Sequence, residues 1–165
     1  MELTSGLKLM TVPQPILRRK AQPISVITPE IKMLAEKMVV AMNEFKGVGL
    51  AAPQINHSLR LMVITDHQGG ATPMINPQIT FSSKEKILSE EGCLSVPGVF
   101  GTVKRAAKIR YKYQTLDGKK MIGKAKNFDA IIMQHEIDHL DGVLFLDKAE
   151  QIIEGRDQLD QLLSI

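Results

Sequence analysis

The chain has 165 residues, of which 44% are hydrophobic and 24% charged, with one cysteine, four histidines and no tryptophan. This composition excludes disordered and fibrous classes, and a single cysteine excludes an internal disulfide and every zinc site that needs two thiolates. No apolar run reaches the length of a membrane span, and the first residues lack the pattern of a secretory signal. We therefore expect one domain over residues 1–165 in a cytoplasmic, reducing compartment, without a membrane partner.

The net charge of +3 is distributed unevenly along the chain. Residues 103–126 contain nine lysines and arginines but only one acid, Asp117, so this segment carries +8 and the rest of the chain carries −5. The chain is therefore a mildly acidic protein with one strongly basic segment.

The first predicted element is a helix. Thr28, Pro29 and Glu30 have the pattern of a helix start, with a threonine cap, a proline in the first turn and an early acid. Apolar residues then recur on one stripe as far as Phe45, and Gly47 is expected to end the helix.

The middle of the chain has the patterns of strands. Residues 61–65 predict a buried strand, and residues 74–81 predict another that is broken at Pro77. Farther on, Ile109, Tyr111 and Tyr113 alternate with basic residues, which is typical of a half-buried strand. The dipeptide Asp117-Gly118 predicts a hairpin turn into a returning strand over residues 120–125.

Helices are expected again near the end of the chain. Asn127 is placed to cap a helix that runs to about Leu140 and ends at Gly142. Asp147 and Glu150 have the spacing of a capping box for an amphipathic C-terminal helix. The order of elements predicts an α+β fold, with antiparallel β-sheets packed around a central helix and with an N-terminal and a C-terminal helix.

The strongest chemical pattern is the pentapeptide His135-Glu136-Ile137-Asp138-His139. Residues i and i+4 of a helix lie on one face, so both imidazoles can reach one metal ion. Glu136 lies beside them without ligating, where a general base for an activated water belongs. The alternative interpretation is a pair of structural histidines with a surface glutamate.

Two imidazoles need a third protein ligand to make a stable catalytic site. Phe145 occupies the position at which one class of metalloproteases has a third histidine, and it cannot ligate. Glu150 or Glu154 could serve as the third ligand. So could Cys93, although a lone cysteine is more often a small buried hydrophobe.

Three segments of the chain together resemble the motifs of peptide deformylases, in order and in spacing. They are Gly47-Val48-Gly49-Leu50-Ala51-Ala52-Pro53-Gln54, Glu91-Gly92-Cys93-Leu94-Ser95 and Gln134-His135-Glu136-Ile137-Asp138-His139. Members of this family are hydrolases that remove the N-formyl group from N-formylmethionine at the start of new polypeptides and release formate. The resemblance implies the same substrate for this chain.

The resemblance also implies a metal centre in which Cys93, His135 and His139 bind one divalent ion, with water as the fourth ligand. It implies Fe(II) as the native ion, and Ni(II), Co(II) or Zn(II) in preparations. Three protein ligands with one open position are typical of a catalytic metal site.

By the same resemblance, Glu136 is the general acid and base, and the Gln54 side chain and the Leu94 backbone N–H stabilise the tetrahedral intermediate. The substrate lies extended along protein backbone, and its methionine side chain enters an apolar pocket. The residues expected to bind substrate are Val48, Gly49, Glu91, Gly92, Phe128, Ile131 and Ile132. Phe100 stands at the pocket mouth, where many relatives have arginine or tyrosine.

The sequence also leads to predictions for charged residues and histidines that have none of these roles. We expect Glu91 and Asp138 to orient the metal ligands, with Arg105 as their counter-charge. His57 and His67 lie in polar surroundings and are expected on the surface.

The basic segment 103–126 has two interpretations. It is either the solvated face of an amphipathic sheet or a surface with weak attraction to the ribosome. Its tyrosines alternate with the cations and therefore point to the opposite face of the sheet. We therefore expect no aromatic platform on which bases could stack beside the cations, and no specific nucleic-acid recognition. Two rival functions stay open: an endopeptidase with Glu150 or Glu154 as third ligand, and a metal-stabilised or ribosome-binding module that has lost activity.

Overall fold

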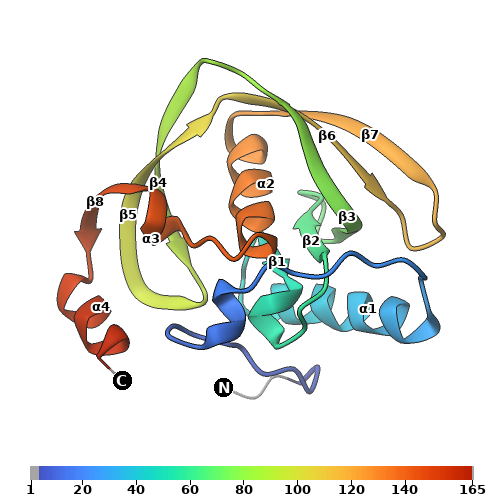
Figure 1. The fold of residues 1–165 in the computed structure, drawn as a ribbon, viewed down its shortest axis with the longest axis horizontal. Helices are drawn as coiled ribbons and strands as arrows, with labels where there is room; N and C mark the ends of the chain where they lie inside the picture. Colours follow the sequence, from blue (N-terminus) through green and yellow to red (C-terminus); the bar gives the residue numbers. More distant parts are fainter. Residues whose placement is uncertain (1–3, 165) are drawn as a thin grey trace.

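The computed structural model describes residues 4–164 (Figure 1). The α-helices and 3₁₀ helices (η) are η1 (Pro15–Arg18), α1 (Pro29–Glu44), η2 (Ala52–Ile55), α2 (Asn127–Leu140), α3 (Phe145–Lys148) and α4 (Arg156–Leu163). The strands are β1 (Gly49–Ala51), β2 (Leu61–Thr65), β3 (Ala71–Ser82), β4 (Lys86–Cys93), β5 (Val96–Ala106), β6 (Lys108–Gln114), β7 (Lys120–Lys126) and β8 (Ala149–Glu154). Within residues 4–164, no helix has both the length and the apolar character that crossing a membrane requires.

The strands form two antiparallel sheets. One has the order β1-β2-β3-β6-β7, and the other has the order β4-β5-β8. In Figure 1, α2 stands between the two sheets, and it contacts β1, β2 and β7 of the first sheet and β5 of the second. The expected α+β fold with antiparallel sheets around a central helix is confirmed.

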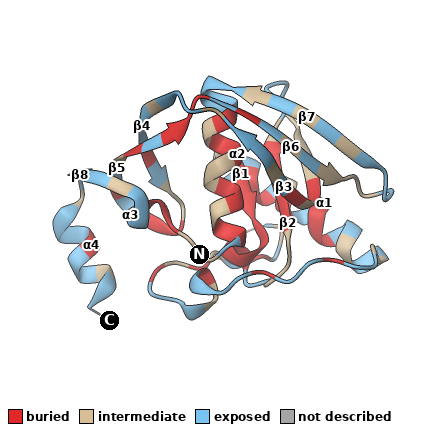
Figure 2. Ribbon diagram, turned by 45° about the horizontal axis from the view of Figure 1, so that its top comes forward, coloured by how far each residue is buried: buried red, intermediate tan, exposed pale blue. Residues whose placement is uncertain are grey.

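The apolar core explains why α2 is central. One cluster joins α1 to β1 and β2, and a second joins α2 to the inner face of the five-stranded sheet. A third cluster packs β5 against η1, α3 and α4. Buried positions run along α2 and one side of α1, whereas α4 is largely exposed (Figure 2). Burial of these apolar side chains is the main term that holds the sheets on the helix.

The predicted first helix is confirmed as α1. Its cap is Thr28, whose hydroxyl accepts a hydrogen bond from the Ile31 N–H at 3.3 Å. The predicted cap of the second helix is wrong, because Asn127 is itself the first helical residue and makes no capping bond. Its N–H donates to the Ala107 carbonyl at 2.9 Å, and its φ of 54° is one that asparagine tolerates.

The predicted break at Pro77 is also wrong, because β3 continues through it. The strand changes register between Ile75 and Gln78, so the proline lies at a bulge, where no ladder hydrogen bond is lost. The Asn76 side chain holds the bend, because it accepts a bond from the Ile24 N–H at 2.9 Å and donates one to the Ile24 carbonyl at 2.8 Å.

The predicted capping box near the C-terminus is wrong as well. The Asp147 carboxylate accepts a bond from the Leu144 N–H at 2.9 Å and so caps the short helix α3. Glu150 lies on strand β8 and pairs with Lys104 at 3.1 Å. The segment is a strand because β5 offers it a partner, and the C-terminal helix α4 begins only at Arg156.

The predicted hairpin is confirmed as β6 and β7, which pair along their whole length. Gly118 in the turn has a φ of 80°, which glycine adopts without strain. Tyr111 and Tyr113 pack inward against the core cluster under the sheet, as their alternation with basic residues predicts.

Candidate metal centre and active site

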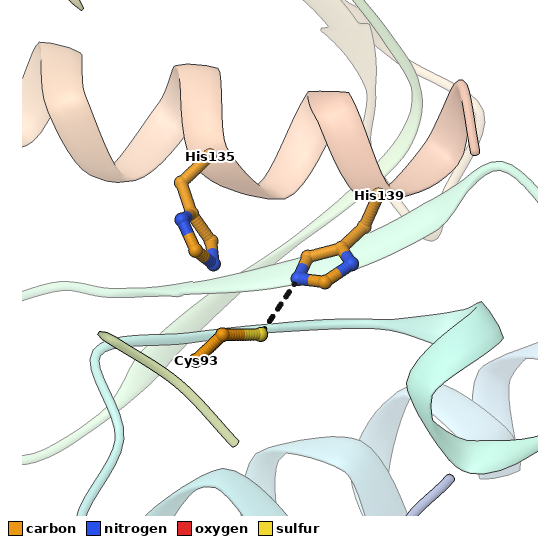
Figure 3. A group of neighbouring side chains, drawn as sticks. All are labelled: Cys93, His135 and His139. Carbon is orange, nitrogen blue, oxygen red and sulfur yellow. Dashed lines mark hydrogen bonds between the residues drawn. The ribbon is translucent and has the colours of Figure 1, made fainter. Parts of the chain in front are cut away.

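Two histidines from α2 and one cysteine from the end of β4 meet beside the helix (Figure 3). Their ligand atoms, the Cys93 Sγ and one ring nitrogen each of His135 and His139, lie within 4.8 Å of one another. The Cys93 Sγ is 3.2 Å from the His139 Nε2. In the part of the chain that the structure describes, no other such trio of His, Cys, Asp or Glu side chains is found.

This set of donors fits a divalent transition-metal ion. Thiolate and imidazole are ligands that such ions prefer, and three protein ligands leave a position open. Glu150 and Glu154 are exposed on β8 and do not belong to this group of donors. The geometry therefore favours Cys93 as the third ligand.

A buried arginine links the two elements that carry the donors. The Arg105 Nε and Nη2 donate to the two carboxylate oxygens of Glu91, both at 2.8 Å, and Nη1 donates to Asp138 at 2.5 Å. Glu91 in turn contacts the His135 Nδ1 at 2.9 Å, which leaves Nε2 for a metal. The expected inward orientation of both acids is confirmed, but Asp138 contacts Arg105 and, at 2.9 Å, Lys148 rather than a metal ligand.

The charges in this cluster shift the titration of its members. Burial by itself raises the pKa of Glu91, but the bonds from Arg105 and His135 outweigh it and lower the pKa to about 2. Burial, followed by the charges of His135 and Arg105, lowers the pKa of His139 well below its ordinary value. His139 is therefore neutral, the form that binds metals. Burial also lowers the pKa of His135, but its bonds with Cys93 and Glu91 outweigh this and raise the pKa.

Arg105→Lys is expected to lower the free energy of unfolding by about 2 kcal/mol, because an ammonium group cannot make the three charge-assisted bonds of the guanidinium. Chemical denaturation of the metal-free protein measures the change. The matched control is Arg19→Lys at an exposed position, with an expected change below about 0.5 kcal/mol. Equal stability of both variants would show that Arg105 contributes only its charge.

Glu136 is buried in the pocket wall beside the metal donors. Its side chain is 5% exposed, and its Oε2 atom has no hydrogen-bond partner among the described residues. Burial raises the pKa of Glu136 to about 7. A Cβ atom on Gly49 would lie 2.8 Å from the Glu136 Cγ and Oε1, so only glycine lets β1 approach this closely.

The Gln54 amide contacts both Cys93 and a residue for which the sequence indicated no role. The Gln54 Oε1 accepts a bond from the Ala51 N–H at 3.0 Å, and its Nε2 donates to the Ser95 hydroxyl at 3.2 Å. The same Nε2 is 3.7 Å from the Cys93 Sγ. Ser95 is fully buried. Its position two residues after Cys93 was the only feature of the sequence that could have indicated a role in the site. Leu94 lies between them in the pocket wall.

A pocket of about 600 Å³ opens beside the metal donors. The predicted substrate residues all line it, together with Glu136, Gln54 and Leu94; they are Val48, Gly49, Glu91, Gly92, Phe128, Ile131 and Ile132. The Glu91 carboxylate is occupied by Arg105 and His135, so its backbone is the part left for a ligand.

Further apolar residues in the pocket wall were not expected from sequence. Leu9, Phe45 and Pro97 come from three separate regions and line the pocket together. Phe100, which the resemblance placed at the pocket mouth, lines it as well, and a Cβ atom on Gly92 would lie 2.5 Å from the Phe100 ring. Only the folded chain brings these residues together.

The remaining histidines lie outside the site. His57 and His67 are both exposed, as expected, and His67 pairs with Asp129 at 2.5 Å.

The chain is similar over most of its length to known peptide deformylases. It is 43% identical to the peptide deformylase of Desulforudis audaxviator over 150 residues. The aligned region covers 91% of this chain and 97% of that protein. The crystal structure of peptide deformylase from Thermotoga maritima matches with a TM-score of 0.84 and 36% identity, over 88% of this chain and 98% of that one. The structure of Arabidopsis thaliana peptide deformylase 1B in complex with an inhibitor matches with a TM-score of 0.88 and 32% identity, over 94% of this chain and 90% of that one. The family model described as polypeptide deformylase matches residues 7–154. The chain therefore belongs to the polypeptide deformylase family.

Proposed function

We propose that this chain is a metal-dependent hydrolase that removes the N-formyl group from N-formylmethionine at the N-terminus of newly made polypeptides and releases formate. The observation that carries the proposal is the trio Cys93, His135 and His139 beside the buried carboxylate of Glu136, in the wall of one pocket. Membership of the deformylase family supports the same reaction.

Cys93, His135 and His139 would hold one divalent ion, which we propose is Fe(II) natively and Ni(II), Co(II) or Zn(II) in some preparations. When bound, the ion acts as a Lewis acid that polarises the formyl carbonyl and lowers the pKa of water. Arg105 and Glu91 keep the His135 ring in the orientation that presents Nε2.

Glu136 would move the proton during hydrolysis. Its free carboxylate oxygen accepts a proton from water as the water oxygen forms its bond to the formyl carbon. The carbon–nitrogen bond then breaks, and Glu136 returns the proton to the amine nitrogen, so that the free N-terminus and formic acid leave, and the acid ionises to formate. The close approach of β1 at Gly49 holds the carboxylate in place.

Gln54 and the Leu94 N–H would donate to the oxygen that becomes negatively charged in the intermediate. The bonds of Gln54 to Ala51 and Ser95 fix its amide before substrate arrives, which is what such a donor requires.

Gln54→Ala is expected to lower kcat by roughly 10²- to 10³-fold, because one preorganised donor is lost. Steady-state formate release measures kcat, and metal content is determined on the same sample. Gln161→Ala, which removes an exposed amide on α4, is the control and should retain kcat. An unchanged kcat in Gln54→Ala with metal bound would remove this residue from the mechanism.

The substrate would lie between β1 and β4. We propose that its backbone pairs with Val48, Gly49 and the Glu91–Gly92 segment. Its methionine side chain would enter the apolar part of the pocket, formed by Phe128, Ile131 and Ile132.

Other expectations from the sequence stay predictions. They are a single catalytic domain over residues 1–165, a cytoplasmic location, and weak association with the ribosome through residues 103–126. The ribosome would be the place where such an enzyme meets its substrate.

The test is to load the protein with Fe(II) or Ni(II) without oxygen and to offer it an N-formyl-Met peptide. We expect release of formate without cleavage of internal peptide bonds, and no reaction with the N-acetyl-Met peptide of the same sequence. Internal cleavage without formate would establish the rival endopeptidase, and no turnover with metal bound would favour the inactive module.

A further inference from the structure

The outward side of the β6–β7 hairpin carries a cluster of exposed cations, here called the basic face. Because alternate residues of a strand point the same way, three side chains from each strand contribute. The six residues of the basic face are Lys108, Arg110, Lys112, Lys120, Lys124 and Lys126, and all are exposed. Figure 1 shows the hairpin as an arm at the edge of the five-stranded sheet, far from α4.

The structure separates these six cations from the other basic residues of segment 103–126. Arg105 is buried with Glu91, and Lys104 pairs with Glu150, so both of these charges are neutralised. Among residues 4–164, no ion pair within 4.0 Å involves a residue of the basic face. Strands β3, β6 and β7 contain no acid at all.

The cations also face one another across the two strands. Lys108 lies opposite Lys126, and Arg110 lies opposite Lys124. Like charges in directly opposite positions destabilise a sheet. Because no acid among the described residues lies within 4.0 Å to relieve this repulsion, the basic face has a dense positive charge that is suited to a polyanion.

The apolar groups near the basic face restrict which polyanion fits. Tyr111 and Tyr113 point into the core, and the Arg110 guanidinium lies 5.4 Å from the centre of the Phe81 ring, which it covers. No free aromatic ring is therefore offered to unpaired bases in this region of the described chain. Ile122 is the one apolar side chain among the outward residues of β7, too little to anchor the face in a lipid bilayer.

We propose that the basic face binds the phosphate backbone of base-paired RNA, without reading its sequence. The choice of RNA over other polyanions rests on the proposed function, because a nascent polypeptide emerges at an RNA-rich surface. Double-stranded RNA is recognised through its shape and its backbone, which needs cations and no stacking platform. Binding here leaves the pocket open, since none of the six residues lines it.

The strength of binding is expected to depend steeply on salt. If about four phosphates are neutralised at once, the Kd rises roughly 50-fold between about 50 and 150 mM monovalent salt. Such binding is weak at physiological ionic strength and reversible, as a brief encounter with a ribosome requires.

The test compares two double variants that change the net charge equally. Lys124→Glu with Lys126→Glu places carboxylates opposite Arg110 and Lys108, which relieves the repulsion and should hold or raise the Tm. Lys32→Glu with Lys37→Glu makes the same change on the exposed side of α1. The metal-loaded proteins are titrated with an RNA duplex of about 16 base pairs, its single strand, the matching DNA duplex, and vesicles of phosphatidylserine and phosphatidylcholine.

We expect the hairpin variant to bind duplex RNA at least about tenfold more weakly than the parent, and the α1 variant to bind it within about twofold. Equal weakening in both variants would reduce the effect to net charge and overturn the proposal. So would tighter binding of single-stranded RNA, duplex DNA or vesicles, or no RNA binding at low salt. Formate release from a short N-formyl-Met peptide should be the same in all three proteins. A parent protein that turns over normally but does not bind duplex RNA at low salt therefore refutes only this inference, and a parent protein that binds the RNA but does not turn over refutes only the proposed function.

Discussion

Cys93→Ala is expected to lower the affinity for the metal ion by more than roughly 100-fold and to abolish formate release. The substitution removes the one thiolate and leaves two imidazoles, which do not make a stable site for a divalent ion. Changes that merely disturb a ligand already cost about 10- to 100-fold in affinity, so loss of the ligand itself must cost more. Metal content after dialysis against a competing chelator measures the effect.

The controls for this experiment are Glu150→Ala and Glu154→Ala. Both residues are exposed on β8, and both should keep a full complement of metal. If Cys93→Ala keeps its metal while one of these variants loses it, the metal site has been placed wrongly and the endopeptidase becomes the better interpretation.

Glu136→Gln is expected to lower kcat by roughly 10²- to 10⁴-fold while metal content stays unchanged. Glutamine keeps the volume of the buried side chain, so the contact with Gly49 and the packing of β1 are preserved. What is lost is the group that accepts and returns the proton. Formate release, measured per bound metal ion, separates this loss from a loss of metal.

The matched control is Glu90→Gln, the same substitution at an exposed position that also lines the pocket. Its kcat should stay within about twofold of the parent, which corresponds to less than about 0.5 kcal/mol. A similar fall in both variants would mean that the negative charge around the pocket matters, rather than proton transfer by Glu136.

Local elements of the fold were predicted well from sequence because their causes are local. The start of α1 depends on Thr28 and Pro29, and the β6–β7 turn depends on Gly118. The predictions failed where contacts with residues distant in the sequence determine the local structure. The segment from Glu150 has the composition of a helix but becomes β8, because it pairs with β5.

In the candidate site, too, the features with local causes were predictable from sequence and those that depend on distant contacts were not. His135 and His139 could be paired from sequence, because helical geometry places residues i and i+4 on one face. Cys93 could not be distinguished from Glu150 as a third ligand by spacing alone; its selection came from a family resemblance, and the fold places its thiol at the histidines. Ser95 and Leu9 were missed because their positions near the pocket depend entirely on packing.

By itself, the sequence determined the family, the helical histidine pair with Glu136, and the alternation of the basic hairpin, because each depends on short-range spacing. The tertiary structure alone decided which charges meet. Arg105 and Lys104 belong to the same basic segment as Lys124, yet the fold buries the first between two acids, pairs the second and leaves the third exposed. The net charge of a segment can be added up from its sequence. Ion pairing, however, depends on distances of a few ångströms between residues that only folding brings together.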